Sequence, residues 1–153
     1  MAGPLRITAT PANHSGFRPP AGPRATALGF VVAGRSRVYF AGDTDLFPEM
    51  AEMAGSIDVA LLPIWGWGRT VGPGHLDPDR AAEALALLQP ALAIPIHWGT
   101  FASRGVRRDR LWFLDEPPRA FAARAASVAP QVTVKILQPG ECTGIGSYRR
   151  LPV

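Results

Sequence analysis

Two short apolar runs, residues 57–64 (IDVALLPI) and 91–96 (ALAIPI), lie on either side of a strong helix-start signal. Runs this short and this apolar are typical of strands buried on both faces of a sheet. Asp77 followed by Pro78 predicts a helix that extends to Leu88, because Asp is a favoured N-cap and Pro suits the first helical turn. A buried strand, a helix and a second buried strand in this order predict a parallel α/β unit.

The rest of the chain continues this alternation. Four further segments predict strands from their apolar, β-branched or alternating content: residues 6–10, 27–33, 37–41 and 132–137. Two further segments have helical spacing: residues 46–54 and 118–129. The turn at 34–36 (GRS) joins the second and third strands as a hairpin. We therefore expect an α/β fold, with residues 1–153 forming one domain.

Composition favours an ordinary globular protein. Apolar residues make up 47% of the 153 and charged residues 18%, which argues against disorder. Cys142 is the only cysteine, so no disulfide framework exists and a reducing compartment is expected. Neither a secretory signal nor a membrane-spanning run is recognisable, and we expect a cytoplasmic protein without a transmembrane segment.

The net charge of +4 comes almost entirely from arginine. The densest basic stretch contains Arg104, Arg107, Arg108 and Arg110. It is either a solvated loop or a clamp for an anionic substrate, because guanidinium groups suit phosphate and carboxylate. A third interpretation, nucleic-acid binding, lacks interleaved aromatic residues and a recognisable module, so we expect no nucleic-acid partner.

Four polar side chains lie where a site is expected. His14, His75 and His97 are the only histidines, and each is beside a turn or a strand end. Asp43 directly follows an apolar run. Imidazole and carboxylate groups at the ends of several strands are how a fold assembles a transition-metal site. Metal-dependent hydrolysis is therefore the leading functional hypothesis.

Each of these residues also has a simpler interpretation. His14 is in a Ser/Gly loop and fits an ordinary surface residue, whereas His97 fits a hydrogen-bonded histidine at the end of a core strand. Asp43 fits the N-cap of the helix expected from residue 46. His75 fits either a plain loop residue or a proton donor next to a helix N-terminus.

In their order along the chain, these segments resemble the metallo-β-lactamase superfamily. The matching segments are 11–15 (PANHS), 38–44 (VYFAGDT), 57–64 (IDVALLPI), 75–78 (HLDP), 94–101 (IPIHWGTF) and 137–141 (LQPGE). More narrowly, they are similar to the branch that contains N-acyl-phosphatidylethanolamine phospholipase D-like and ascorbate-phosphate lactonase-like enzymes. The similarity spans nearly the whole chain.

This resemblance implies an αββα sandwich with two metal ions, usually zinc, with manganese or iron as alternatives. His14 matches a ligand of the first ion, Asp43 the carboxylate that bridges both, and His97 a ligand of the second. His75 matches a catalytic histidine at the substrate site that is not a ligand. Trp65 and Trp67 fall in a loop that walls the substrate pocket in such enzymes, although simple core packing also accounts for both rings.

The superfamily motif His-x-His-x-Asp-His is absent from this chain. That motif belongs to the N-terminal half of the fold, so the chain resembles the C-terminal half with the N-terminal half missing. The strand at 6–10 is then expected to be an exposed edge. Each metal would retain one imidazole and a share of Asp43, whereas catalytic zinc usually has three protein ligands.

Two functional hypotheses follow from the resemblance. In the first, the chain is the C-terminal part of a metal-dependent, di-zinc hydrolase that cleaves a phosphodiester, ester or lactone with metal-activated hydroxide. Its substrate would be a small or phospholipid-like anion, and the missing half would come from an upstream segment, a separate chain or a second copy in a homo-oligomer. In the second, the chain is a non-catalytic remnant or a partner-binding module without a complete metal site.

Overall fold

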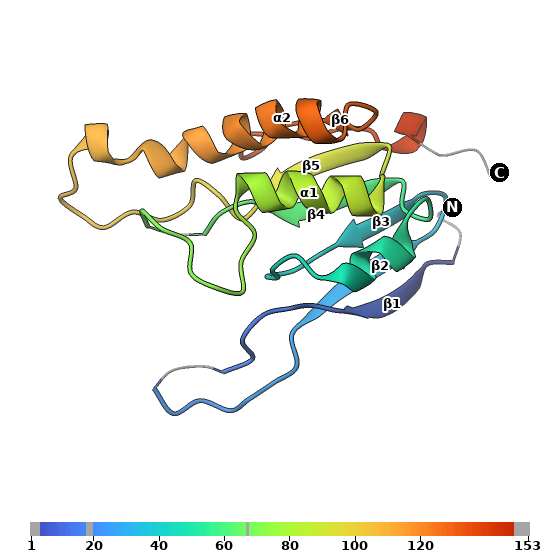
Figure 1. The fold of residues 1–153 in the computed structure, drawn as a ribbon, viewed down its shortest axis with the longest axis horizontal. Coiled ribbons are helices and arrows are strands. Elements are labelled where there is room, and N and C mark those ends of the chain that lie inside the picture. The colour runs from blue at the N-terminus through green and yellow to red at the C-terminus, as the bar shows by residue number, and fades with distance from the viewer. Residues whose placement is uncertain (1–3, 18–19, 67, 149–153) are drawn as a thin grey trace.

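The computed structural model describes residues 4–17, 20–66 and 68–148, in which six strands form one sheet in chain order (Figure 1). The strands are β1 (Arg6–Pro11), β2 (Leu28–Ala33), β3 (Arg37–Phe40), β4 (Val59–Pro63), β5 (Leu92–Ile96) and β6 (Thr133–Val134). Pairing is antiparallel from β1 to β3 and parallel from β3 to β6. The expected α/β class is confirmed, and β1 is the edge strand that the sequence predicts.

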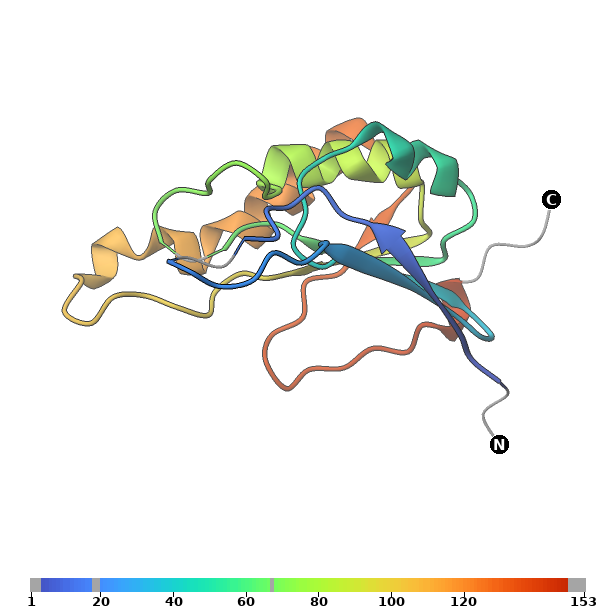
Figure 2. The ribbon, with the colours of Figure 1, turned by 90° about the horizontal axis from the view of Figure 1, so that it is seen from below.

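Two helices cover one face of the sheet (Figure 2). Helix α1 (Pro78–Leu88) begins as predicted, with the Asp77 carboxylate accepting a hydrogen bond from the Arg80 backbone N–H at 2.9 Å. Helix α2 (Glu116–Val128) has two prolines in its first turn, where no intrahelical N–H is needed. Leu85 and Leu88 of α1 and Phe121 of α2 are fully buried in the core between the helices and the sheet.

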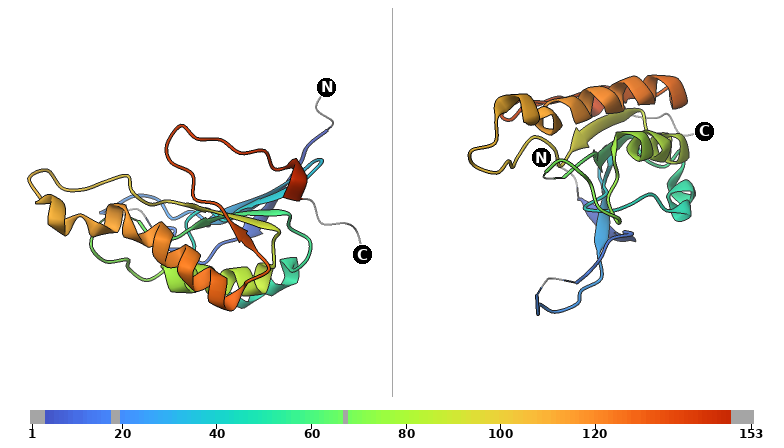
Figure 3. Two further views of the ribbon diagram at one scale, coloured as in Figure 1. Left: turned by 90° about the horizontal axis from the view of Figure 1, so that it is seen from above. Right: turned by 60° about the vertical axis from the view of Figure 1, so that its left-hand side comes forward.

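Two predicted elements differ from the structure. The helical spacing over 46–54 forms a 3-10 helix, η1 (Pro48–Met53), which begins after Phe47 without a side-chain cap. The strand expected over 132–137 pairs only at Thr133–Val134. Beyond it the chain crosses to the sheet face opposite the helices, where Leu137 packs against the buried cluster of Val59, Leu92 and Ile94 (Figure 3). The apolar pattern that predicts a longer strand is therefore used for packing.

Short 3-10 turns complete the described elements: η2 (Arg108–Arg110), η3 (Trp112–Leu114) and η4 (Gly146–Tyr148). Within the described ranges no helix is long and apolar enough to cross a bilayer. The described arginines of the loop that contains η2 fit both a solvated loop and an anion clamp. Arg104, Arg107 and Arg110 are exposed, and Arg107 pairs with Asp109 at 3.1 Å.

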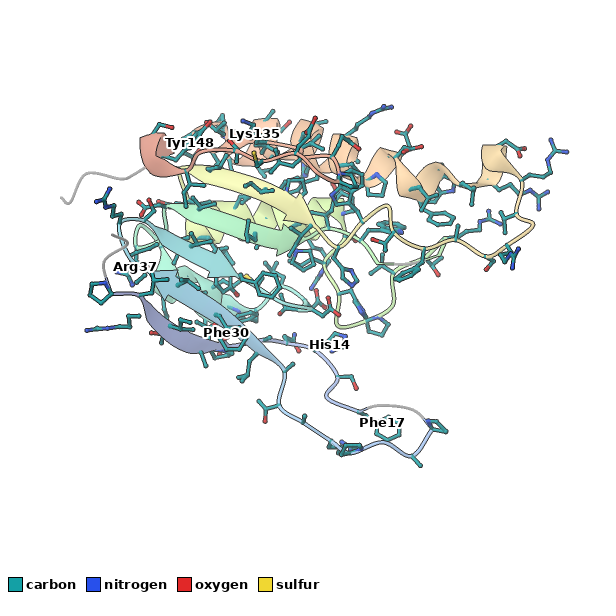
Figure 4. All side chains as sticks on the ribbon, turned by 180° about the vertical axis from the view of Figure 1, so that it is seen from behind. His14, Phe17, Phe30, Arg37, Lys135 and Tyr148 are labelled. Atoms are coloured by element: carbon teal, nitrogen blue, oxygen red, sulfur yellow. The ribbon has the colours of Figure 1, made fainter. Side chains whose placement is uncertain are left out.

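The face of the sheet opposite the helices carries apolar rows that continue across the strands. Register aligns Phe30 with Phe40, Phe40 with Leu61, and Leu61 with Ile94. The C-terminal segment packs on this face over β4 and β5. Over β1 to β3 this face of the sheet stays open, with Ile7 66%, Phe30 37% and Phe40 41% exposed. Figure 4 labels Phe30 on β2. The exposed surface formed by Ile7, Phe30 and Phe40 is called the outer apolar face below.

The inner face contains one buried hydroxyl pair. Tyr39 is fully buried, and burial raises the pKa of its phenol to about 12. The neighbouring Thr10 hydroxyl offsets part of that rise, although the two hydroxyls do not meet the geometry of a hydrogen bond. The folded state therefore favours neutral Tyr39 in surroundings that do not solvate a phenolate.

Replacing Tyr39 with phenylalanine is expected to remove one source of alkaline instability. An unfolded tyrosine ionises near pH 10, whereas the folded one stays neutral to about pH 12. The stabilising contribution is therefore complete below pH 10 and is lost as pH rises to 12, by about 2–3 kcal/mol. Urea unfolding at pH 8 and pH 11.5 measures this, and an equal loss in both proteins would contradict the assignment.

Candidate metal centre

The candidate site lies at one end of the sheet because of strand direction. β1 is antiparallel to β2, and β2 to β3, so β1 runs parallel to β3, β4 and β5. The carboxyl ends of these four strands therefore lie at the same end of the sheet. His14 follows β1, where the chain leaves the sheet (Figure 4), Asp43 follows β3, and His97 follows β5. The carboxyl ends of the strands are where α/β folds bind their ligands.

Thr44 is hydrogen-bonded to the segment after β1 and to the loop before α1. Its fully buried hydroxyl accepts a hydrogen bond from the Asn13 backbone N–H at 2.9 Å, and its carbonyl accepts one from the Leu76 N–H at 2.9 Å. His14 and His75 are the immediate neighbours of these two residues, so both imidazoles are brought to the Asp43 turn. Sequence analysis did not assign Thr44 a role, because nothing local to it indicates its partners 31 and 32 positions away.

The turn that carries Asp43 requires glycine immediately before it. Gly42 has a φ of +66°, and a Cβ there would lie 2.8 Å from the Leu28 carbonyl oxygen. Any other residue would be strained by both the backbone angle and the contact. The chain can therefore leave β3 sharply, and the Asp43 side chain is delivered to the edge of the sheet.

Asp45 and Arg80 fix the other side of this turn. The Asp45 carboxylate accepts hydrogen bonds from the Leu46 N–H at 2.8 Å and from Arg80 Nε at 2.7 Å. Arg80 lies in the first turn of α1, so the ion pair links the helix to the loop after β3. No local sequence pattern indicates this pair, since a carboxylate near a helix start is equally suited to capping.

All four chemistry-bearing side chains come together. One ligand atom from each of His14, Asp43 and His75 lies within 4.8 Å of the other two. The Nε2 atoms of His14 and His75 are 3.2 Å apart, and His97 Nε2 is 3.2 Å from Asp43 Oδ1. The alternative of Asp43 as a helix N-cap is wrong, because η1 begins only after Phe47.

Backbone carbonyls determine which imidazole nitrogens are free. His97 Nδ1 is 3.0 Å from the Trp65 carbonyl oxygen, and His75 Nδ1 is 3.3 Å from the Gly72 carbonyl oxygen. A carbonyl only accepts, so Nδ1 carries the proton in both rings. In a neutral ring, Nε2 then presents a lone pair. His97 Nε2 faces the Asp43 carboxylate, so a proton or a cation is needed between these two acceptors.

His97 has an uncommon backbone conformation. Its φ of +60° lies in the left-handed region that non-glycine residues rarely adopt. The residue comes directly after β5, and this angle turns its ring toward Asp43 and the Trp65 carbonyl. Such strain persists where the surrounding contacts impose it, and it is concentrated at functional sites.

A cavity of about 440 Å³ opens over this group. Its described lining consists of Asp43, His75 and His97 together with Gly66, Gly68, Arg69, Thr70, Val71 and Gly72. Trp65 is not part of that lining. Its ring packs edge-on against Trp112 at 5.5 Å, and its indole N–H donates to the Gly68 carbonyl at 3.1 Å. Trp67 lies outside the described residues.

A sheet covered by helices on one face, with histidine and aspartate gathered at its strand ends, defines an α/β protein of the metallo-β-lactamase type. Residues 1–98 match the beta-lactamase superfamily domain, and the chain belongs to that superfamily.

Curated relatives are longer than this chain. A UPF0173 metal-dependent hydrolase from Methanopyrus kandleri is 37% identical and covers 95% of this chain, which covers 57% of that protein. One from Caldivirga maquilingensis is 34% identical, with coverages of 92% and 56%. The solved structure of Igni18, a metallo hydrolase from Ignicoccus hospitalis, has a TM-score of 0.65 at 32% identity, covering 90% of this chain and 51% of that one. The chain thus spans about half the length of the relatives it matches.

Proposed function

We propose that this chain supplies one side of the active site of a metal-dependent hydrolase. The observation that carries the proposal is the meeting of His14, Asp43, His75 and His97 at the carboxyl ends of the strands, with Asp43 Oδ1 facing His97 Nε2 at 3.2 Å. The relatives named as metal-dependent hydrolases give independent support.

The donor spacing fits a metal ion. Two donors bound to one zinc ion are each about 2.0–2.1 Å from it, so they lie no more than about 4.2 Å apart. His97 Nε2, at 3.2 Å from Asp43 Oδ1, is already within that limit, and the ligand atoms of His14 and Asp43, which lie within 4.8 Å of each other, need at most a small contraction. We assign His14, Asp43 and His97 as ligands, with Asp43 shared between two ions in the complete site. We propose zinc, which this set of imidazole and carboxylate donors suits, with manganese or iron as alternatives.

His75 is assigned as the catalytic histidine at the substrate rather than as a ligand. Its Nδ1–H is engaged by the Gly72 carbonyl, and it lines the cavity beside Asp43. A second assignment makes His75 a ligand together with His14. It is favoured by the spacing of His14, Asp43 and His75, whose ligand atoms lie within 4.8 Å of one another. The two assignments differ in what happens to bound metal when His75 is replaced.

The chain's own residues have separate roles in hydrolysis. A metal ion held here supplies Lewis-acid polarisation and lowers the pKa of water. Asp43 orients the His97 ring and carries the negative charge that neutralises the cation. His75 Nε2 exchanges a proton with the reacting oxygen or stabilises its developing negative charge. The backbone carbonyls of Gly72 and Trp65 hold the two rings in the required tautomers.

The proposed substrate is a small or phospholipid-like anion with a phosphodiester, ester or lactone bond. The cavity supports this class because it combines the His/Asp group with the exposed Arg69. The sequence resemblance to N-acyl-phosphatidylethanolamine phospholipase D-like and ascorbate-phosphate lactonase-like enzymes points in the same direction. The alternative, a non-catalytic partner-binding module, is favoured by the outer apolar face.

Zinc titration of the purified chain, followed by assay with bis(p-nitrophenyl) phosphate, separates these two functions. A hydrolase half should bind zinc at micromolar concentration or tighter, and should hydrolyse the diester either alone or with the complementary half added. Zinc binding weaker than millimolar, with no hydrolysis under either condition, would favour the partner-binding module.

Replacing His75 with alanine is expected to leave zinc affinity within about threefold and to lower the hydrolysis rate by about 10²–10⁴-fold, the usual contribution of a positioned acid or base. His14→Ala is the matched comparison and should weaken zinc binding by at least about 10–100-fold. Calorimetry of both variants measures the difference. An equal loss of zinc in both would show that His75 is a ligand.

A further inference from the structure

A second cavity adjoins the metal centre and has a different character. It has a volume of about 630 Å³ and is lined by Gly68, Arg69, Phe101, Ala102, Ser103, Val106 and Phe113. Gly68 and Arg69 also line the cavity over the His/Asp group, so the two spaces meet at these residues. Both volumes are in the range typical of small-molecule sites.

One wall of the second cavity, formed by Phe101, Val106 and Phe113, is apolar. Phe113 forms a buried part of the wall with 3% exposure, whereas the Phe101 ring is 67% exposed. Val106 is also partly exposed beside them. A large aromatic ring held in water at the rim of a cavity gains free energy when an apolar ligand covers it.

Arg69 lies where the two cavities meet, because it lines both of them. It is exposed, and no ion pair connects it to a carboxylate in the part of the chain that the structure describes. A guanidinium without a protein counter-ion is suited to a phosphoryl or carboxylate group of a ligand. An anion bound there would lie between the apolar wall and the Asp43–His97 pair.

Aromatic packing connects the wall to the metal centre. The Phe113 ring contacts Trp112 with centroids 6.1 Å apart, and Trp112 contacts Trp65 at 5.5 Å. The carbonyl of Trp65 in turn holds His97 Nδ1 at 3.0 Å. Phe113 of the apolar wall is thus connected through two ring contacts to the residue whose carbonyl holds His97.

We propose that the second cavity is a substrate subsite for an apolar chain or ring, and that Arg69 binds the anionic group to which this apolar part is attached. The substrate is then an amphiphilic anion, with its charged group at the metal centre and its apolar part against Phe101, Val106 and Phe113. The proposal rests on the proposed function for the bond that is cleaved, whereas the binding itself requires no metal.

Alkylphosphonates of increasing length test the subsite directly. Calorimetry of the metal-free chain with methyl-, butyl- and octylphosphonate should show affinity rising about three- to fourfold for each methylene group buried. Phe101→Ser should reduce the preference for octyl- over methylphosphonate by about tenfold, because it removes one apolar wall. Phe17→Ser, at an exposed phenylalanine that lines neither cavity, is the matched control and should leave the preference unchanged.

Arg69→Gln should weaken all three phosphonates by about the same factor and leave the gain per methylene intact. Affinity that is independent of chain length, or a chain-length preference that survives Phe101→Ser, would overturn the subsite. A preference that is present in the metal-free chain while zinc binding and hydrolysis are absent would support the subsite and contradict the proposed function. The two proposals can therefore fail separately.

Discussion

Replacing Asp43 with alanine is expected to weaken zinc binding by this chain by at least about 100-fold, a larger loss than removal of a residue that only hydrogen-bonds to a ligand causes. Asp43 is the only acidic member of the His14–Asp43–His75 group, and its Oδ1 is also the partner of His97 Nε2. Its loss removes the negative charge that neutralises a bound cation. It also removes the carboxylate that faces His97 Nε2. Zinc titration by calorimetry measures the change.

Two controls separate this effect from misfolding and from general charge. Asp43 lies in a loop and is partly exposed, so the variant should keep its far-UV circular dichroism and its urea midpoint. Asp79→Ala removes an exposed carboxylate of α1 that pairs with Arg124 at 3.5 Å, and zinc affinity should then be unchanged. Similar zinc loss in both variants would mean that zinc binds through diffuse surface charge and not at the His/Asp group.

The strands and helices were largely predictable because their signals are local. The buried strands β4 and β5 and helix α1 follow from apolar runs and from the Asp77-Pro78 start, and the structure confirms all three. Where packing decided the outcome, the prediction was wrong. Residues after Val134 leave the strand because Leu137 packs, partly buried, against β4 and β5, and an apolar pattern alone does not distinguish packing from strand pairing.

The site was predictable as a set of residues and much less as a set of contacts. The three histidines and Asp43 stand out by residue type and by their places at strand ends. The connections that assemble them, through Thr44, Gly42 and the Asp45–Arg80 pair, join positions far apart in sequence, and no local pattern indicates them. The role proposed for Arg69 could not be predicted for the same reason, since it depends on two loops that line the same cavity.

The outer apolar face supports the proposal that a second layer covers it. Phe30 and Phe40 are paired in register on adjacent strands, with Ile7 exposed on the edge strand. An apolar surface that continues across three strands is characteristic of an interaction site. The implied occupant is the other sheet of an αββα sandwich, supplied by a complementary N-terminal half or by a second copy of the chain. We expect the complementary half, because this chain covers only 56% and 57% of two longer relatives.

The double substitution Phe30→Ser and Phe40→Ser is therefore expected to raise the concentration at which the isolated chain self-associates by more than tenfold. Burying one phenylalanine side chain contributes about 1.5–3 kcal/mol, and a factor of ten corresponds to about 1.4 kcal/mol. Sedimentation velocity over a range of concentrations, with binding of an anilinonaphthalene dye, measures the change. Both residues are already partly exposed, so the fold should be retained.

Phe101→Ser is the matched control for this experiment, because it removes an exposed phenylalanine that lies outside the sheet. It should leave self-association close to that of the unchanged chain, since a single ring on a loop does not form an extended apolar row. If the complementary half is the occupant, adding it should suppress dye binding by the unchanged chain and have little effect on the double variant. A chain that remains monomeric and binds no dye before any substitution would show that this face is compatible with water and requires no second layer.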